Sequence, residues 1–289
     1  MSSPAARPRA KSTDHNTSPS SEALAALKAR IYTAVTSSPT STSPSTSSLN
    51  GAEIVSTTSQ SFSASTVSTT SPAMANLIPR VVEYVKEYMA QYDGSHDFNH
   101  IKRVLGLAHV LRQQEPNAYD KDIVTLAALL HDVGDRKYLK PGQVGETMVR
   151  DVLLQMGSEQ QLAERIQEIV NCVSYSSEIK PDGLQKINFC IKKYGREIEV
   201  VQDADRIDAI GAVGVGRCFA FGGSKVRGLQ DSIDHFTDKL ERLGGMMKTQ
   251  LGRQMAKERT ETIVVMRRAW ERENEEAMKG LEWMNLDWS

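Results

Sequence analysis

Residues 125–132 of this chain read Thr-Leu-Ala-Ala-Leu-Leu-His-Asp. The first six of them belong to a longer segment, 120–130, whose later part is apolar on nearly every side. A helix formed there has no polar face to turn towards water. The segment therefore predicts a helix in the core of a folded domain. His131 and Asp132, at the end of that helix, need hydrogen-bond partners or a cation, because burying an unsatisfied polar group is costly.

Apolar residues recur at helical spacing on both sides of this segment. Residues 197–202 are rich in β-branched side chains, but their neighbours have helical character. The sequence contains no convincing strand ladder and no internal repeat, so the predicted fold class is all-α. The expected helices cover residues 77–89, 96–111, 120–130, 144–156, 160–174 and 204–220, with one long helix or two between 240 and 270.

The beginning of the 289-residue chain has a different composition. Of its first 73 residues, 32 are Ser or Thr, and six of the ten prolines lie within residues 1–75. Such a segment buries too little apolar surface to offset an ordering entropy of about 1–2 kcal/mol per residue. We therefore expect a disordered arm over residues 1–75 and one folded domain over residues 76–289. A helical island at 21–31 leaves organelle import open as an alternative to a cytoplasmic location.

Charge and cysteine content exclude several classes of protein. The net charge of −1 gives no sign of nucleic-acid binding or of a polybasic membrane contact. The sequence contains no run of about 18 apolar residues, so no transmembrane helix is expected. The start of the chain lacks the apolar region of a secretory signal. The three cysteines are too few and too widely spaced for a disulfide framework or a CxxC zinc site, which indicates reduced thiols: Cys172, Cys190 and Cys218.

Further polar groups interrupt other apolar segments. His100 lies near the start of an expected helix, and Asp203 and Asp205 lie in a downstream apolar run. Two imidazoles and two carboxylates suit a borderline divalent ion and leave coordination positions for water and substrate oxygens. Asp203 and Asp205 are separated by about 200° around a helix, so only one of them is expected to face such an ion.

Three motifs in order carry a family resemblance. Residues 96–104 read His-Asp-Phe-Asn-His-Ile-Lys-Arg-Val, residues 131–137 read His-Asp-Val-Gly-Asp-Arg-Lys, and residues 203–211 read Asp-Ala-Asp-Arg-Ile-Asp-Ala-Ile-Gly. The chain resembles the HD superfamily of metal-dependent phosphohydrolases, in particular its small standalone hydrolases, over about residues 77–275. This resemblance implies a helical bundle with a metal ion on its axis.

The resemblance also implies the ligands of the ion. Matched position by position, they are His100, His131, Asp132 and Asp205, with Asp203 as the alternative last ligand. One divalent ion is expected, because the residues between 169 and 174 lack the extra histidines of two-metal relatives. Mn²⁺ is the favoured ion, with Mg²⁺, Fe²⁺, Co²⁺, Ni²⁺ and Zn²⁺ as alternatives.

Catalytic roles are assigned to three neighbours of these ligands. Asp135 is expected to take a proton from water at the ion, and Lys137 to act with it by holding a phosphate. His96 lies one helical turn before His100 and is expected to contact phosphate or that water. The alternatives are ordinary surface charges in the turn and a histidine that only packs at the start of a helix.

Substrate-binding roles are assigned to four cations. Lys137 is counted again here, and Arg103 is expected to clamp a phosphate. Lys225 and Arg227 lie in a glycine-rich stretch, 221–228, that is expected to cover the substrate. The alternatives are a solvated helix face for Arg103 and an ordinary interhelix loop for the stretch. Asp208 is expected to brace a ligand or a basic residue.

The implied activity is hydrolysis of a phosphoester or phosphoanhydride in a small phosphorylated molecule. A nucleotide is favoured, with pyrophosphate release from a nucleoside triphosphate as the specific reaction. The alternative from another class is a non-catalytic nucleotide sensor or scaffold that is regulated through the arm. No nucleic-acid or membrane partner is expected, and the sequence does not define an oligomeric state.

Overall fold

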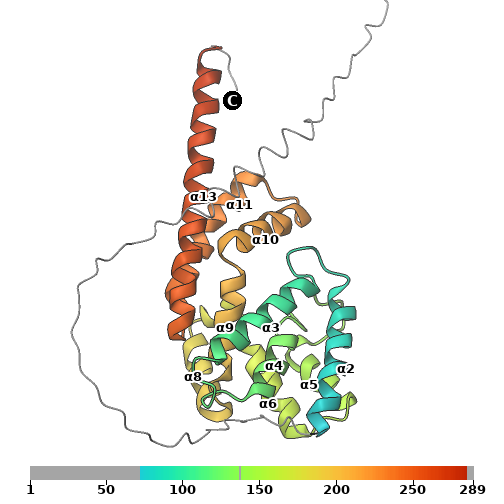
Figure 1. Ribbon diagram of the computed structural model, residues 1–289. Helices are drawn as coiled ribbons and strands as arrows, with labels where there is room; N and C mark the ends of the chain where they lie inside the picture. Colours follow the sequence, from blue (N-terminus) through green and yellow to red (C-terminus); the bar gives the residue numbers. More distant parts are fainter. Residues whose placement is uncertain (1–71, 137, 285–289) are drawn as a thin grey trace, which may run out of the picture. The chain divides into compact units, whose positions relative to one another are not determined.

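The computed structural model describes residues 72–136 and 138–284, which lie in one unit spanning residues 66–289 (Figure 1). This described part is all-α, as predicted, and contains no strand. A π-helical turn, η1 (Phe236–Leu240), and a 3₁₀ turn, η2 (Gly244–Met246), join the later helices. The α-helices are α2 (Pro72–Met89), α3 (Phe98–Arg112), α4 (Lys121–Leu130), α5 (Gly145–Gln155), α6 (Gln160–Asn171), α7 (Tyr175–Glu178), α8 (Gly183–Tyr194), α9 (Glu197–Asp208), α10 (Gly211–Ser224), α11 (Leu229–His235), α12 (Glu241–Leu243) and α13 (Gln250–Glu282).

The predicted arm lies almost entirely outside the described residues, and so does the helical island at 21–31. The last four residues of the predicted arm, 72–75, belong to α2, which begins earlier than the sequence indicated. Among the described helices, none combines the length and the apolar character needed to cross a membrane.

Helix α4 is the buried centre of the bundle. Asp120 caps its start, because the carboxylate accepts hydrogen bonds from the backbone N–H groups of Asp122 and Ile123. Every residue from Ile123 to Leu130 is buried, and helices α2, α3, α6 and α9 pack around α4 (Figure 1). The prediction of a core helix is confirmed, and its C-terminal end delivers His131 and Asp132 to the interior.

The prediction of one helix over residues 204–220 is wrong, because α9 ends at Asp208 and α10 begins at Gly211. Gly211 has a φ of +75°, in the left-handed region that favours glycine. A Cβ at this position would lie 3.0 Å from the Arg259 side chain of α13. The glycine-rich stretch 211–216 therefore opens a new helix, which packs against α11 and α13.

Buried hydrogen bonds fix the start of α13. The carboxylate of Asp203 accepts hydrogen bonds from the backbone N–H of Lys248 at 2.8 Å and from the N–H and hydroxyl of Thr249 at 2.7 and 2.8 Å. Thr249 in turn caps α13 by accepting from the N–H of Gly252 at 3.0 Å. Asp203 thus joins α9 to the C-terminal helix.

The break between α9 and α10 predicts different outcomes for two alanine substitutions. Gly211→Ala should lower the free energy of unfolding by about 1–3 kcal/mol, because it places a side chain at positive φ against Arg259. Gly216→Ala, in an exposed part of α10 where an added methyl group meets only open space, should raise it by roughly 0.5–1 kcal/mol. Urea unfolding followed by circular dichroism measures both, and equal effects would contradict the role assigned to Gly211.

Candidate metal centre

Three helices bring the predicted ligands together. His100 lies in the first turn of α3, where Asp97 caps the helix by accepting from the N–H of His100 at 3.0 Å. His131 ends α4, Asp132 follows it directly, and Asp205 lies in the last turns of α9. Helices α3, α4 and α9 pack against one another in all three pairs, so these side chains meet where the three helices converge.

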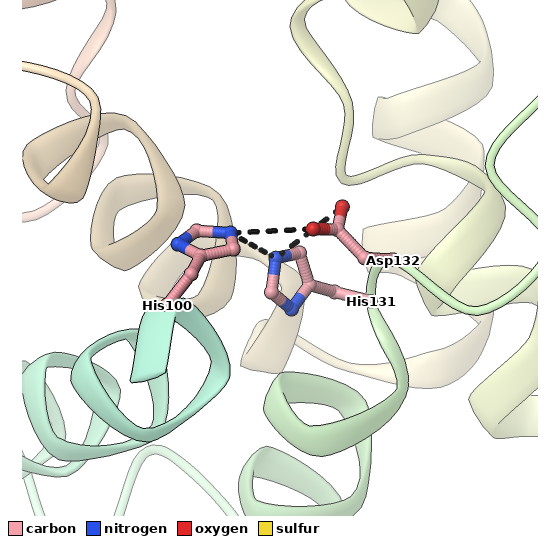
Figure 2. Close-up of side chains that lie close together, drawn as sticks. All are labelled: His100, His131 and Asp132. Carbon is pink, nitrogen blue, oxygen red and sulfur yellow. Dashed lines mark hydrogen bonds and ion pairs between the residues drawn. The ribbon is translucent and has the colours of Figure 1, made fainter. Parts of the chain in front are cut away.

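Three of the four predicted ligands, His100, His131 and Asp132, form a compact cluster, and Asp205 lies beside the two imidazoles. The Nε2 atoms of His100 and His131 are 3.1 Å apart, and Asp132 oxygens lie 3.3 and 3.5 Å from them (Figure 2). The Oδ1 atom of Asp205 lies 3.6 Å from Nε2 of His100 and 3.8 Å from Nε2 of His131. Asp203 instead accepts hydrogen bonds at the start of α13, so the structure brings Asp205 to the imidazoles.

Hydrogen bonds on the far side of each ring fix the direction of its Nε2 lone pair. His131 Nδ1 lies 2.8 Å from the carbonyl oxygen of Ala128, which can only accept, so Nδ1 carries the proton. His100 Nδ1 lies 2.8 Å from the Asp208 carboxylate and donates in the same way. In the neutral rings, both Nε2 lone pairs therefore face each other at 3.1 Å, an arrangement that a shared cation stabilises.

The charges around the rings also favour a cation. Oδ2 of Asp132 is buried and has no hydrogen-bond partner among the described residues. Burial opposes a charge on His100, but the carboxylates of Asp132 and Asp208 outweigh it and raise the pKa of the imidazole. Burial likewise opposes the charge on Asp132, yet His131 and His100 hold its pKa well below the ordinary value.

The donor set fits one divalent ion. Bonds of about 2.1 Å from one ion to two neighbouring ligands place their nitrogen atoms about 3.0–3.4 Å apart, and the observed separation of the His100 and His131 Nε2 atoms is 3.1 Å. Two imidazoles with two carboxylates suit Mn²⁺, Fe²⁺, Co²⁺, Ni²⁺ or Zn²⁺. The unsatisfied Oδ2 of Asp132 supplies a buried acceptor of the kind that such an ion requires.

Asp208 braces both a predicted ligand and two basic residues. Besides His100, it accepts two hydrogen bonds from Arg103, at 2.7 and 3.0 Å, and it lies 3.2 Å from Arg217 of α10. Burial raises the pKa of Asp208, but these partners outweigh it and hold the pKa far below the ordinary value. A carboxylate that holds the outer nitrogen of a ligating histidine fixes its orientation and raises its basicity.

Arg217 was not among the predicted site residues, although the sequence contains a signal for it. Arg217 is the single charged residue among residues 211–224, which are otherwise small or apolar. Its side chain is 11% exposed and also donates to the carbonyl oxygen of Ser95 at 2.7 Å. Arg217 therefore connects α10 both to Asp208 and to the turn that precedes α3.

His96 lies beside the centre and is held by residues that the sequence analysis did not single out. Its Nδ1 atom is 2.6 Å from the Ser95 hydroxyl and 2.9 Å from the Tyr138 hydroxyl. Its ring centroid lies 5.9 Å from that of His100 and 5.7 Å from that of Phe221. The predicted proximity of His96 to the ligands is thus present, while its catalytic role stays a prediction.

The turn after α4 depends on a close approach between two glycines. Gly134 has a φ of +83°, and a Cβ on it would lie 2.9 Å from the backbone oxygen of Gly145. Asp135 follows with a half-buried side chain. Burial and the charges of nearby carboxylates, Asp135 among them, raise the pKa of the Tyr138 phenol. Lys137 lies outside the described residues. The roles given to Asp135 and Lys137 stay predictions.

The three other predicted phosphate-binding cations have different surroundings. Arg103 contacts Asp208, as described above. The Lys225 ammonium lies 5.8 Å from the ring centroid of Tyr138 and 5.6 Å from that of Phe221, the two rings that His96 also contacts. The Arg227 guanidinium donates to the Ser232 hydroxyl at 3.2 Å and to the Cys218 carbonyl at 3.3 Å. Lys225 thus shares the Tyr138 and Phe221 rings with His96, and Arg227 joins α10 to α11.

The described part of the chain is similar to known proteins. The model of the HD domain family matches residues 97–210. The Bacillus subtilis protein YpgQ is 38% identical over 166 residues, which cover 56% of this chain and 76% of YpgQ. The crystal structure of YpgQ in complex with ADP has a TM-score of 0.56 at 32% identity and covers 70% of this chain and 96% of that one. An HD-superfamily hydrolase from Bacillus thuringiensis has a TM-score of 0.51 at 28% identity and covers 69% and 97%.

The chain therefore belongs to the HD superfamily of metal-dependent phosphohydrolases. Within that superfamily it is similar to small standalone HD proteins such as YpgQ, whose chain is covered almost from end to end. The match to the family spans all four predicted ligands, from His100 to Asp205.

The two aspartates of α9 should respond differently to substitution by alanine. Asp203→Ala removes the acceptor for Lys248 and Thr249 and should lower the free energy of unfolding by about 2–4 kcal/mol, with Mn²⁺ affinity retained. Asp205→Ala should abolish tight Mn²⁺ binding and change the stability of the metal-free protein by less than about 1 kcal/mol. Calorimetric titration and urea unfolding measure the two properties, and the reverse pattern would assign the ligand to Asp203.

Mn²⁺ affinity should depend on pH through His100. The protonated ring has no lone pair on Nε2, and the pKa of His100 lies above its ordinary value of 6.5. The apparent affinity should therefore begin to fall above pH 6.5 and then decrease by up to about tenfold per pH unit as the pH is lowered. Titrations between about pH 8 and pH 5.5 in non-coordinating buffers test this, and a constant affinity would contradict it.

Proposed function

We propose that this chain hydrolyses a nucleotide and releases pyrophosphate from a nucleoside triphosphate, with one Mn²⁺ ion as cofactor. The observation that carries the proposal is the pair of Nε2 atoms of His100 and His131, 3.1 Å apart and flanked by Asp132 and Asp205. The ADP bound by the relative YpgQ supports a nucleotide as substrate. The wider class, hydrolysis by an HD-superfamily enzyme, follows from family membership.

His100, His131, Asp132 and Asp205 would hold the ion. When bound, a divalent ion polarises a phosphoryl oxygen and eases the deprotonation of water. The surrounding chain keeps His100 in place: Asp208 holds its Nδ1 atom, and Arg103 and Arg217 offset the charge of Asp208. These contacts pre-organise the centre, so the side chains do not have to rearrange when substrate binds.

Residues beside the centre are assigned the remaining steps. Asp135, in the turn after α4, accepts the proton of the attacking water. His96, oriented by Ser95 and Tyr138, contacts the phosphate chain or that water. Lys225, which lies over the rings of Tyr138 and Phe221, offsets phosphate charge. Lys137 is assigned to phosphate binding from its place in the motif.

A phosphate- and pyrophosphate-release screen over nucleoside triphosphates with Mn²⁺ tests the proposal. Activity should disappear with a chelator, and His131→Ala and Asp205→Ala should lower it by at least about 100-fold, because each removes a ligand. His109→Gln is the matched histidine control and should retain activity, since His109 lies on α3 against the Thr125 hydroxyl at 3.0 Å.

Two other outcomes of that screen would overturn the proposal. Full activity in excess chelator would contradict the metal mechanism. Tight binding of nucleotide and metal without product release from any nucleotide would instead identify the non-catalytic sensor that the sequence left as the alternative.

A further inference from the structure

Two of the three cysteines lie together, although the sequence spacing indicated separate thiols. Cys172 follows the last turn of α6, and Cys190 lies in α8. Each thiol shifts the pKa of the other, so the two lie close together. The pair lies on α6 and α8, whereas the predicted metal ligands lie on α3, α9 and the end of α4, so the proposed catalytic reaction does not use it.

Helix geometry supports the same placement independently. The Sγ atom of Cys190 lies 3.7 Å from the carbonyl oxygen of Glu168, in the last turn of α6. Cys172 lies four residues after Glu168, and helical side chains point back over the preceding turn. The Cys172 side chain therefore covers the turn of α6 that Cys190 contacts from α8, and the two helices pack against each other there.

The two sulfur atoms are not equivalent. Cys190 is 3% exposed, whereas Cys172 is half-buried. The neighbouring Cys190 thiol lowers the pKa of Cys172, aided by the positive charge of Lys186 and opposed by burial and Glu168. The Cys172 thiol and burial raise the pKa of Cys190. Because Cys172 is the more exposed of the two, it is assigned as the attacking thiol and Cys190 as the resolving thiol.

We propose that Cys172 and Cys190 form a peroxide-sensitive dithiol that closes to a disulfide between α6 and α8. The Cys172 thiolate attacks a hydroperoxide, whose O–O bond breaks to give a sulfenic acid and water or an alcohol. The Cys190 sulfur then attacks the Cys172 sulfur, the S–O bond breaks, and the hydroxyl leaves with the Cys190 proton as water. Two thiols are oxidised and one peroxide is reduced.

The disulfide would act on the helix that carries the last predicted metal ligand. The carbonyl oxygen of Cys172 accepts a hydrogen bond from Nε2 of Gln202 at 2.8 Å. Gln202 lies on α9, three residues before Asp205. Closure of the Cys172–Cys190 bond therefore fixes the end of α6 against both α8 and α9, and constrains the segment that contains α7.

Thiol counting and peptide mapping of the full-length protein test the proposal. Stoichiometric hydrogen peroxide should lower the number of titratable thiols from three to one and produce a linked peptide containing Cys172 and Cys190, and dithiothreitol should reverse both changes. Cys218 is the internal control. It is buried, its thiol donates to the Ser232 carbonyl at 3.5 Å, and burial raises its pKa.

Variants separate the two steps of the reaction. Cys190→Ser should stop oxidation at a Cys172 sulfenic acid that dimedone traps, and Cys218→Ser should leave disulfide formation unchanged. Because substitution of a buried cysteine can prevent folding, phenylarsine oxide provides a second test on the unaltered chain. This trivalent arsenical bridges two adjacent thiols, so one molecule should bind per chain and block peroxide closure.

Some results would overturn the proposal. They are three free thiols after peroxide, a disulfide that contains Cys218 or joins two chains, and no retention of the arsenical. These measurements follow sulfur chemistry alone, so they are independent of the proposed nucleotide hydrolysis.

Discussion

The contact between the His100 and Asp208 side chains is the interaction on which the rest of the centre depends. Both side chains are buried, and the 2.8 Å contact between them fixes the ring of His100 so that its other nitrogen meets that of His131. A buried carboxylate is costly unless it has donors, and Asp208 obtains them from α3 and α10 as well as from His100. Asp208 therefore connects α3, α9 and α10 through one buried charge.

The break between α9 and α10 lets a second cation reach this carboxylate. A continuous helix through residues 204–220 would carry Arg217 along the axis of α9, away from Asp208. The positive φ of Gly211 redirects the chain, and Arg217 returns to the carboxylate. The same redirection places the end of α10, with Phe221 and Lys225, beside His96.

The parts of the fold that the sequence predicted are those set by local pattern. The apolar run before His131 predicts a core helix without knowledge of its neighbours, and the three motifs predict which side chains converge. The break at Gly211 depends on the contact with Arg259 of α13, which local propensity does not encode. The hydrogen bond between Tyr138 and His96 depends on a turn held by Gly134 against Gly145. Helix α8 was missed although apolar residues recur along it at helical spacing.

The spacing of the centre along the chain has a consequence for folding. His100 and Asp208 are 108 residues apart, and His100 and His131 are 31 apart. Contacts of such long range form late, because the entropy of closing the loop is lost before the contact contributes. An ion held by three helices cross-links these distant segments in the folded state alone, so it slows opening more than it speeds collapse.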